Sequence, residues 1–442
     1  MNTELLKSKL LEAAFNGSLT HANTNKWEFV NLNDVCEFDN GYAFASGDYK
    51  TEGIPLVRIS NIQNNEIDLT DAVCIQGEYP ERFVIHKGDL LIAMSGATTG
   101  KMGIYNLERK AYLNQRVGKI RIKDEQIILP KYRNFFFQNQ TDNILRLAYG
   151  SAQPNISGKM ILSLVVPLPP IAEQQRIVAV LEEGFAYIDT IASAKQNLSD
   201  SARLLRNKIL QAAISGTLVD HCIEDEPASL LLDRLRKEKE ELDKKNLIPR
   251  KPFVPPISSD WEKPFDIPQN WVWCYLAEVS LIQEGAGIMK HQYRDNGIQL
   301  LTVTNIKEGD INMGNHIICI EKDEYNLKYK NLTLNKGDIV TACSGGSWGK
   351  TAIFDKDGIY MLNTSTLRLR FWSDLACNKY LYYLSKTKFF KSQLEEQLSG
   401  LQPNFGYAHY SKIAIPLPPL AEQQRIVAKI EELFAEIDKL VK

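Results

Sequence analysis

The sequence is poor in the features that identify several common classes of protein. Its 442 residues include seven cysteines, which stand singly without a Cys-x-x-Cys pair, so neither a disulfide framework nor a zinc knuckle is indicated. The six histidines are equally dispersed, and the close pair His221 and Cys222, in a polar connector, is a poor ligand set. We therefore expect no bound metal and no cofactor.

Long apolar runs and a strong charge are missing as well. No run approaches the roughly 20 apolar residues of a membrane span. The start, MNTELLKSKLLEAAF, has no apolar core followed by a cleavage site, so we expect a cytoplasmic protein. A formal net charge of −2 argues weakly against a protein that binds nucleic acid through overall charge alone.

Motifs of catalysis are also absent. The chain has no nucleophile elbow, no His-Glu-x-x-His and no Gly-x-Gly-x-x-Gly after a predicted strand. The repeated PLPPI and PLPPL lack the leading amide or acid, and the aromatic residue, of the turn found in adenine methyltransferases. We expect a protein without catalytic residues of its own.

One stretch does resemble a phosphate-binding loop, because residues 344–351 read SGGSWGKT. A Walker A loop needs four residues between its first glycine and the Gly-Lys pair, and it opens a long helix. Here three residues separate Gly345 from Gly349, and a β-like run follows the loop. The spacing and the context both argue against a nucleotide site.

The dominant feature of the sequence is an internal repeat. Residues 167–189, PLPPIAEQQRIVAVLEEGFAYID, recur at 416–438 with 18 of 23 positions identical, at an offset of 249. The same offset aligns residues 86–105 with 335–354, and a slightly smaller one aligns GIPLVRISNI with GIQLLTVTNI. The chain therefore contains two domains of about 140 residues that share one design, called here the first head and the second head.

A third match indicates how the chain is arranged. Residues 5–20 are identical to residues 204–219 at 8 of 16 positions. The central segment therefore looks like the C-terminal segment joined to the N-terminal one, as in a pseudo-twofold ring opened at one point. We expect a circularly permuted arrangement with the two chain ends near each other.

The central segment has the periodicity of a long helix. Its apolar residues recur at a mean spacing of 3.5, which is typical of a coiled-coil seam. Pro170 and Gly216 are placed as a helix start and a helix stop, and about 45 residues give a rod of roughly 65 Å. We expect the central and C-terminal segments to pair as antiparallel helices, extended by the N-terminal helix. The seam positions are Ile177, Leu181, Phe185, Ile188, Ile191, Ala194, Leu198, Ala202, Leu205, Ile209 and Ala212, then Ile426, Ile430, Phe434, Ile437 and Val441.

The heads are predicted to be α+β domains, because β-like runs alternate with Gly, Asp and Asn and each head closes with a helical stretch. The aromatic clusters Phe135–Phe137 and Tyr380–Tyr383 lie in these stretches and are expected in the core. Between the halves, residues 228–246 are expected to form a charged, solvated surface helix. The Pro-rich linker that follows is expected to be extended and semi-rigid.

Several motifs in combination carry a resemblance to a known family. The repeated LPPLAEQQRIVAKIEEL segment, the loops SGATTGK and SGGSWGK, the elements AQPN and LQPN and the segment FDIPQNWVW resemble the specificity (S) subunit of Type I restriction–modification systems. The resemblance covers essentially the whole chain. It implies a phage-defence protein in which each target-recognition domain binds one half of a bipartite, asymmetric DNA sequence.

The resemblance also implies partners. The family's S subunit has no catalysis of its own and recruits two adenine methyltransferase (M) subunits, whose helices pack against its coiled coil. ATP- and magnesium-dependent restriction (R) subunits complete the complex. Half-sites about one helical turn apart, roughly 34 Å, would place both heads on one face of double-stranded DNA.

The expected fold class is therefore α+β, with two similar α+β target-recognition domains separated by long antiparallel coiled-coil helices in a pseudo-twofold, circularly permuted arrangement. The expected boundaries are an N-terminal helix at 1–24, target-recognition domain 1 (the first head) at 25–165, a central helical region at 166–248, the Pro-rich linker at 249–265, target-recognition domain 2 (the second head) at 266–414, and a C-terminal helix at 415–442.

Candidate DNA-binding residues are polar groups of loops and strand ends, with donors suited to base edges and phosphates. In the first head they are Arg58, Ser60, Asn61, Ser95, Thr98, Thr99, Lys101, Asn114, Gln115, Arg116, Gln153 and Asn155. In the second head they are Thr302, Thr304, Asn305, Ser344, Ser347, Trp348, Lys350, Asn363, Thr364, Ser365, Gln402 and Asn404.

The two sets suggest a division of labour. Positions that match between the heads are expected to hold phosphate or the fold, namely Asn61/Asn305, Lys101/Lys350 and Asn114/Asn363. Positions that differ are expected to read sequence, because the two half-sites should differ, namely Arg116/Ser365, Thr99/Trp348 and Arg58/Thr302. The loop SGGSWGKT, and its repeat SGATTGKM, then bring Lys350 and Lys101 against the DNA backbone.

Two other hypotheses stay open at this point. A two-headed adaptor that binds proteins is favoured by the near-neutral charge, although an S subunit within a complex need not be basic, because its partners can supply phosphate attraction. An ATPase built on SGGSWGKT predicts ATP binding that is lost in Lys350→Ala.

Overall fold

The computed structural model describes residues 2–441 except 64, 97, 149–153, 247, 249–250, 259, 315–316, 373–374 and 398–402. The chain divides into two compact units, Met1–Lys195 and Gln196–Lys442. One helix, α6 (Ile171–Ser215), runs for 45 residues and contributes to both units. It confirms the helix predicted between Pro170 and Gly216. Among the described residues, no helix is both long enough and apolar enough to cross a bilayer.

The first unit is built on three sheets. A six-stranded sheet has the order β2-β11-β8-β9-β5-β4, a four-stranded sheet has the order β6-β3-β10-β7, and β1 pairs with β12. Most pairs are antiparallel, but β5 with β9 and β3 with β10 are parallel. The strands are β1 (Glu28–Asn31), β2 (Cys36–Asn40), β3 (Ile54–Val57), β4 (Ile62–Gln63), β5 (Asn65–Ile67), β6 (Cys74–Ile75), β7 (Val84–Ile85), β8 (Leu90–Ala93), β9 (Met102–Ile104), β10 (Ala111–Leu113), β11 (Val117–Ile122) and β12 (Val165–Leu168).

The central strand β8 shows how the first head is held together. All four of its residues are buried, and because side chains alternate along a strand they enter two different cores. Leu90 and Ile92 pack in the cluster that contains Phe136 and Phe137, as expected for these aromatics. Leu91 and Ala93 pack in the cluster on the other face. Burial of the Phe136 or Phe137 ring stabilises the fold by about 1.5–3 kcal/mol.

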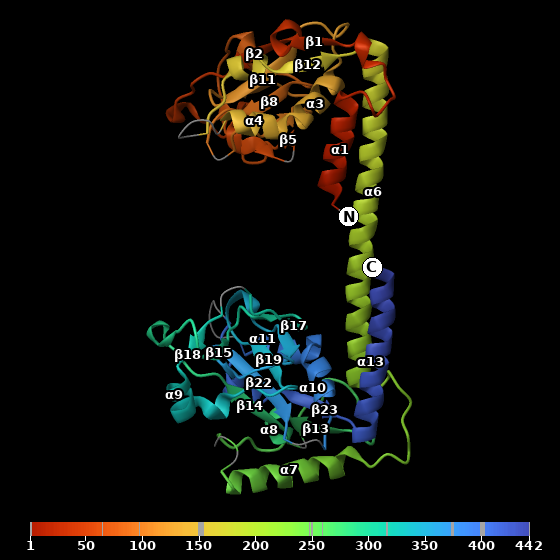
Figure 1. Ribbon diagram of the computed structural model, residues 1–442, viewed down its shortest axis with the longest axis vertical. Coiled ribbons are helices and arrows are strands. Elements are labelled where there is room, and N and C mark those ends of the chain that lie inside the picture. The colour runs from red at the N-terminus through yellow and green to blue at the C-terminus, as the bar shows by residue number, and fades with distance from the viewer. Residues whose placement is uncertain are drawn as a thin grey trace. The chain divides into compact units, whose positions relative to one another are not determined.

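The helices of the first unit are α1 (Thr3–Phe15), α2 (Leu32–Val35), α3 (Pro130–Asn139), α4 (Thr141–Ala148), α5 (Gly158–Leu162) and the first part of α6. Helix α1 runs antiparallel to α6, since Lys7 pairs with Asp189 at 2.6 Å and Thr20, beyond the end of α1, donates to Glu173 (Figure 1). Leu11 of α1 shares a buried cluster with Ile177 of α6.

The second unit repeats the centre of this topology, but β16 and β17 form a separate pair and the second sheet has three strands where the first unit has four. Its sheets have the orders β14-β22-β19-β20 and β18-β15-β21, and β13 pairs with β23 and β16 with β17. This repeat supports the α+β fold class in both halves. The strands are β13 (Val272–Tyr275), β14 (Ser280–Glu284), β15 (Ile298–Leu301), β16 (Ile306–Lys307), β17 (Asp310–Ile311), β18 (Cys319–Ile320), β19 (Ile339–Ala342), β20 (Thr351–Ile353), β21 (Tyr360–Leu362), β22 (Thr366–Phe371) and β23 (Ala414–Leu417).

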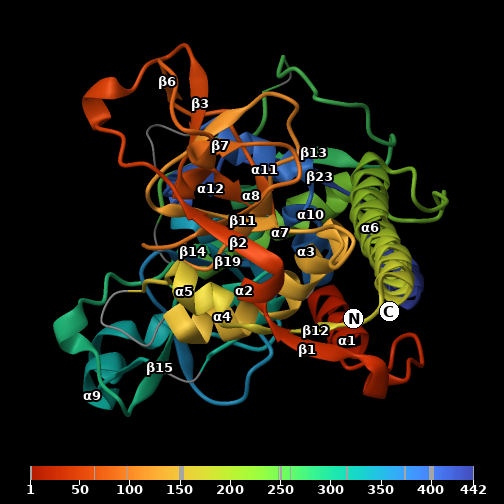
Figure 2. The same cartoon turned by 90° about the horizontal axis from the view of Figure 1, so that it is seen from above.

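The helices of the second unit include one long C-terminal helix, which lies along the second part of α6 in both views (Figures 1 and 2). This helix, α13, is antiparallel to α6: Arg206 pairs with Asp438, while Asp225, beyond the end of α6, pairs with Arg425 at 2.6 Å. The helices are α7 (Ala228–Lys244), α8 (Leu276–Val279), α9 (Lys322–Glu324), α10 (Asn378–Ser385), α11 (Lys388–Glu395), α12 (Tyr407–Tyr410) and α13 (Leu420–Val441).

Two expectations about helices need correction. The stretch expected to be a solvated surface helix forms α7, but Leu231, Leu232 and Leu235 are buried against the second head, because they recur on one face of the helix. The helical stretch that closes each head is split in two, into α3 and α4 and into α10 and α11. In the second head the break occurs where the Thr387 hydroxyl accepts from the Phe390 N–H and starts a new helix.

Candidate nucleic-acid interface

The glycine-rich loop has the same backbone in both heads. In the first head it joins β8 to β9, and the N–H groups of Thr99 and Gly100 donate to the carbonyls of Gly96 and Ala93. In the second head it joins β19 to β20, and Trp348 and Gly349 donate to Gly345 and Ala342 in the same way. A strand therefore follows the lysine, whereas a Walker A loop opens a helix there. The loop is a hairpin connection, as the β-like run after it indicated, and this agrees with the glycine spacing, which argued against a nucleotide site.

Three other segments meet at this loop in each head. In the first head, Ser95 bridges to Asn155, the Met94 N–H donates to the Arg116 carbonyl at 2.9 Å, and the Asn114 N–H donates to Val57 at 3.2 Å. The second head repeats these contacts. There Ser344 forms a β-bridge with Asn404. The Cys343 N–H donates to the Ser365 carbonyl at 2.8 Å, and the Asn363 N–H donates to the Leu301 carbonyl at 3.1 Å.

These contacts bring the predicted residues together. We call the surface that they form the loop edge of each head. It consists of Arg58–Asn61, Ser95–Lys101 without residue 97, Asn114–Arg116 and Asn155 in the first head, and of Thr302–Asn305, Ser344–Lys350, Asn363–Ser365 and Asn404 in the second. Gln153 and Gln402 lie outside the described residues.

A glycine holds the loop edge against the sheet. The residue after β2 is Gly41, and a Cβ placed on it would lie 2.1 Å from the Asn114 carbonyl oxygen. The residue after β14 is Gly285, where the corresponding distance to the Asn363 oxygen is 2.0 Å. Only glycine permits this approach, which sets the asparagine turn beside the first strand of the sheet.

Several of the predicted residues are committed to the fold. The Asn61 side chain accepts from the Arg58 N–H at 2.9 Å and donates to the Asp68 carbonyl at 2.9 Å. Asn305 makes the same two bonds, with Thr302 and Asn312. These amides therefore close a turn in each head, and we assign them a supporting role.

Three further side chains of the loop edge are buried. Thr99 is 4% exposed, and its hydroxyl donates to the carbonyls of Gly96 and Pro154. Asn114 and Asn363 are buried, and their side-chain oxygens accept from the N–H groups of Arg116 and Thr364. The Thr99 hydroxyl thus fastens the loop to the segment before Asn155.

The remaining predicted residues present their side chains to solvent to different degrees. Exposed residues are Ser60, Lys101, Gln115, Arg116, Asn155, Thr304, Thr364 and Asn404. Half-buried residues are Arg58, Ser95, Thr98, Thr302, Ser344, Ser347, Trp348, Lys350 and Ser365. Ser365 has a φ of 61°, a strained conformation for a residue with a side chain, and such strain is common at functional sites.

Aromatic side chains distinguish the two loop edges. In the second head, Trp348 packs against Phe405 with 5.2 Å between ring centroids and the ring planes tilted by 51°. In the first head, Tyr42 bridges to Asn114 and is 42% exposed, with its ring against Phe44 and Phe83. Tyr42 is not among the residues predicted from the sequence. The signal was its position directly after Gly41, the glycine that matches Gly285 in the second head.

Buried charges lie beneath the loop edges. On β11, Lys119 is 2% exposed and its ammonium lies 3.6 Å from Asp39, and burial lowers the pKa of this lysine. On β22, Arg368 occupies the matching position and lies 3.1 Å from Asp338. These cations are enclosed by the fold and are paired, so they belong to the framework rather than to the surface. Within the described part of the chain, no group of three or more His, Cys, Asp or Glu could hold a metal ion.

Comparisons with known proteins agree with the repeat. The Type I restriction modification DNA specificity domain matches residues 24–199 and again residues 268–442. The EcoBI specificity subunit of Escherichia coli is 24% identical, over 100% of this chain and 86% of that subunit. The MjaVIII specificity subunit of Methanocaldococcus jannaschii is 23% identical, over 92% of this chain and 86% of that subunit. The EcoAI specificity subunit of Escherichia coli is 30% identical, over 59% of this chain and 44% of that subunit.

Solved structures share the fold. A chain from a study of complex assembly and conformational transition in the type I R-M system has a TM-score of 0.59 and 18% identity, and the match covers 94% of this chain and 92% of that one. The HsdS subunit from Thermoanaerobacter tengcongensis has a TM-score of 0.50 and 18% identity, with 94% and 90% covered. The predicted resemblance to a non-catalytic specificity subunit is confirmed, and because the domain model covers well over half of the sequence, this chain belongs to the Type I restriction–modification DNA specificity family.

Proposed function

We propose that the chain recognises a bipartite, asymmetric DNA sequence, with one half-site for each head. This proposal rests on one observation: the two loop edges share a backbone framework but expose different side chains. Both loop edges have the same backbone hydrogen bonds, yet Arg116 in one head corresponds to Ser365 in the other. A constant scaffold with variable side chains is suited to reading two different half-sites.

Within each loop edge, the exposed and half-buried residues are the proposed DNA contacts. Lys101 and Lys350 are proposed to contact phosphates, because both extend from the loop and both heads keep them. Arg116 is proposed to read a base, since an exposed guanidinium can donate two hydrogen bonds to guanine. Trp348 and Ser365 are the proposed reading residues of the second head.

The proposal extends to the arrangement of the whole chain. The heads, at 25–165 and 266–414, are proposed to be spaced by antiparallel coiled-coil helices in a pseudo-twofold, circularly permuted arrangement. The packing of α1 and α13 along successive parts of α6 supports this proposal. In this arrangement the chain joins two M subunits through these helices, and R subunits in the full complex, in the cytoplasm.

Methylome sequencing of cells that express the chain with its M partner tests this function. The expected result is a bipartite methylated motif. A chain with residues 266–414 deleted should keep specificity for one half only. If the deleted chain still directs methylation of the full bipartite sequence, the assignment of one head to each half-site is wrong.

The comparisons give no support to the alternative, a protein-binding adaptor. An electrophoretic mobility shift with the purified S–M complex, across salt concentrations, separates the two. Specific binding that weakens as salt rises is expected of a DNA-binding subunit.

A further inference from the structure

Each head has a polar groove at the end of the first strand of its main sheet, and the two linings share matched positions that include Asn40/Glu284, Met94/Cys343 and Ser157/Gly406. In the first head its lining includes Asn40, Met94 and Ser157, and its volume is about 740 Å³. In the second head its lining includes Glu284, Cys343 and Gly406, and its volume is about 530 Å³. Asn40 and Glu284 occupy equivalent places in the structure, because each ends the first strand of its sheet, opposite matching positions of β11 and β22.

The two grooves differ in a coupled pair of residues. Glu284 replaces Asn40, and Gly406 replaces Ser157. A Cβ on Gly406 would lie 2.2 Å from a carboxylate oxygen of Glu284. The glycine therefore makes room for the longer acidic side chain. Gly406 thus leaves space for the Glu284 carboxylate at the end of β14.

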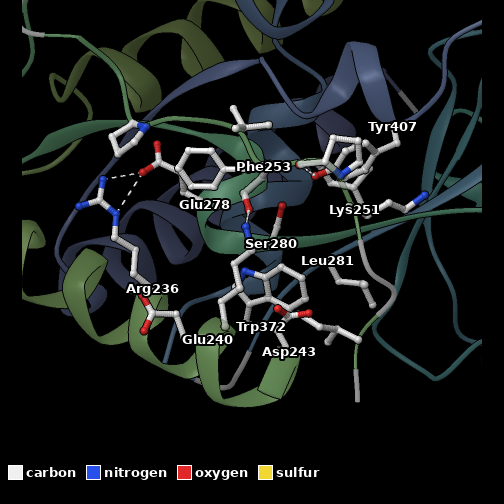
Figure 3. Close-up of a pocket in the computed structure, with 17 residues that line it drawn as sticks. Arg236, Glu240, Asp243, Lys251, Phe253, Glu278, Ser280, Leu281, Trp372 and Tyr407 are labelled. Carbon is white, nitrogen blue, oxygen red and sulfur yellow. Dashed lines mark hydrogen bonds and ion pairs between the residues drawn. The ribbon is translucent and has the colours of Figure 1, made fainter. Parts of the chain in front are cut away.

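The carboxylate is paired with a cation from outside the head. Lys251, in the Pro-rich linker, places its ammonium 3.2 Å from Glu284 and 4.8 Å from the centre of the Tyr407 ring. The Tyr407 hydroxyl donates to the carbonyl of the neighbouring Pro252 at 3.3 Å. The linker thus crosses one side of the groove, and Lys251 lies beside Tyr407 in Figure 3.

A second cavity, on the other side of the linker, helps to seat it. Its volume is about 390 Å³, and it is lined by Phe253, Trp372 and Tyr407 together with part of α7. Helix α7 is itself anchored to the head by Arg236, which pairs with the nearly buried Glu278 (Figure 3). The position of Lys251 is therefore supported by the elements around it.

The groove is continuous with the proposed DNA contacts, because Ser365 and Asn404 line it too. A lone carboxylate there would be repelled by phosphates, and a nearby cation offsets that repulsion. Glu284 and Lys251 are 46% and 29% exposed, so both are accessible.

We propose that Glu284 and Lys251 form part of the base-reading surface of the second head. Glu284 accepts a hydrogen bond from the exocyclic amino group of a base, for which cytosine N4 is the usual partner of a carboxylate. Lys251 neutralises the carboxylate against the phosphates. Asn40 occupies the same place in the first head, and its amide suits adenine. This inference rests on the proposed function, and it makes the linker part of the second DNA site.

The test uses the full chain with its M partner. Three variants are made: Glu284→Gln, Lys251→Met, and the double variant Glu284→Asn with Gly406→Ser, which installs the first head's pair. Lys263→Met, an exposed lysine of the same linker outside the groove, is the matched control. The methylated motif and the Kd for duplexes altered in each half-site are measured.

The expected result is confined to the second half-site. Glu284→Gln and the double variant should change the base accepted at one position of that half, and should weaken binding to the original sequence by at least about fivefold. Lys251→Met should weaken binding more than Lys263→Met does. The motif in the first half should be unchanged, which also shows that the variants fold.

The inference is overturned if both Glu284 variants keep the wild-type motif and affinity. Failure of the proposed function looks different, because the unaltered chain would then yield no bipartite motif at all. If Glu284→Gln fails to assemble with the M partner, the double variant still tests the inference. Its two side chains already occur together in the first head, as Asn40 and Ser157.

Discussion

Single residues of the loop edge separate into those that build it and those that are available to a ligand. Asn61 is 4% exposed and bonded to two backbone groups, whereas its neighbour Ser60 is exposed. The same residue type can therefore be framework at one position and a proposed contact at another, such as Asn155. Burial and partners make the distinction.

Replacing Asn61 with alanine should destabilise the first head. The change leaves the Arg58 N–H and the Asp68 carbonyl without their partner, which costs about 1–3 kcal/mol. Urea unfolding followed by circular dichroism should show the lower stability, and Ser60→Ala should change it by less than about 0.5 kcal/mol. Unaltered stability with weaker DNA binding would place Asn61 in the interface instead.

Cysteine reactivity offers a second test at this scale. Burial raises the pKa of the Cys343 thiol to about 12 and that of Cys36 to about 11, so both stay protonated at pH 8. Because the thiolate is the reactive form, iodoacetamide should label the exposed Cys222 and leave Cys343 and Cys36 unlabelled in the native chain.

Mass spectrometry of the labelled peptides measures this difference. Raising the pH toward the thiol pKa should increase labelling of the buried pair only if reagent can enter, and denaturant should expose all the cysteines. Rapid labelling of Cys343 at pH 8 in the folded chain would contradict its burial beneath the groove of the second head.

At the scale of elements, the long helices depend on a few buried contacts. Ile430 of α13 is fully buried in the cluster that also holds Ile209 of α6, while Leu440, near the end of α13, is 68% exposed. Helix α13 is thus anchored through one face. Propensity alone contributes less than this packing does.

Truncating Ile430 should loosen this pair of helices. Ile430→Ala should cost about 2–5 kcal/mol, because it removes buried methyl groups and leaves a cavity. The control Leu440→Ala should cost less than about 0.5 kcal/mol. Hydrogen exchange of α13 amides measures the effect, and equal protection in both variants would show that the contact with α6 is weak.

At the scale of the whole molecule, the repeat predicts that the chain can begin and end at another point of the sequence and still recognise DNA. The match of residues 5–20 to 204–219 means that the N-terminal segment could continue from the C-terminal one. A circular permutant tests this prediction. Residues 260–442 would be followed by ten Gly/Ser residues and then by residues 2–259.

This permutant should recognise both half-sites with the M partner. A ten-residue flexible linker spans about 17 Å on average, which suffices if the ends are near each other. A second permutant, opened within β22, should lose function, which shows that the assay detects a broken sheet. Loss of both half-sites in the first permutant alone would contradict the circular arrangement.

Local patterns in the sequence were enough for several of these features. The bounds of α6 follow from Pro170, Gly216 and the helical spacing of its apolar residues, because caps and periodicity act within a few residues. The predicted seam is not buried throughout, since Ile191, Leu198 and Leu205 are exposed. The match of Asn114 with Asn363 predicted that this residue holds either the fold or a phosphate, and its buried side chain accepts from the Arg116 N–H. The buried face of α7 and the Thr99 hydroxyl were not anticipated, because their partners lie far away in the sequence.

The sequence by itself determined that the chain has two heads of one design, a long central helix, and a glycine-rich loop that is not a nucleotide site. These conclusions rest on repeats and spacings, which are properties of the chain alone. Only the tertiary structure decided which polar side chains reach the surface and that Lys251 of the linker meets Glu284 of the second head. The reason is physical: burial and pairing depend on residues that folding brings together from distant parts of the sequence.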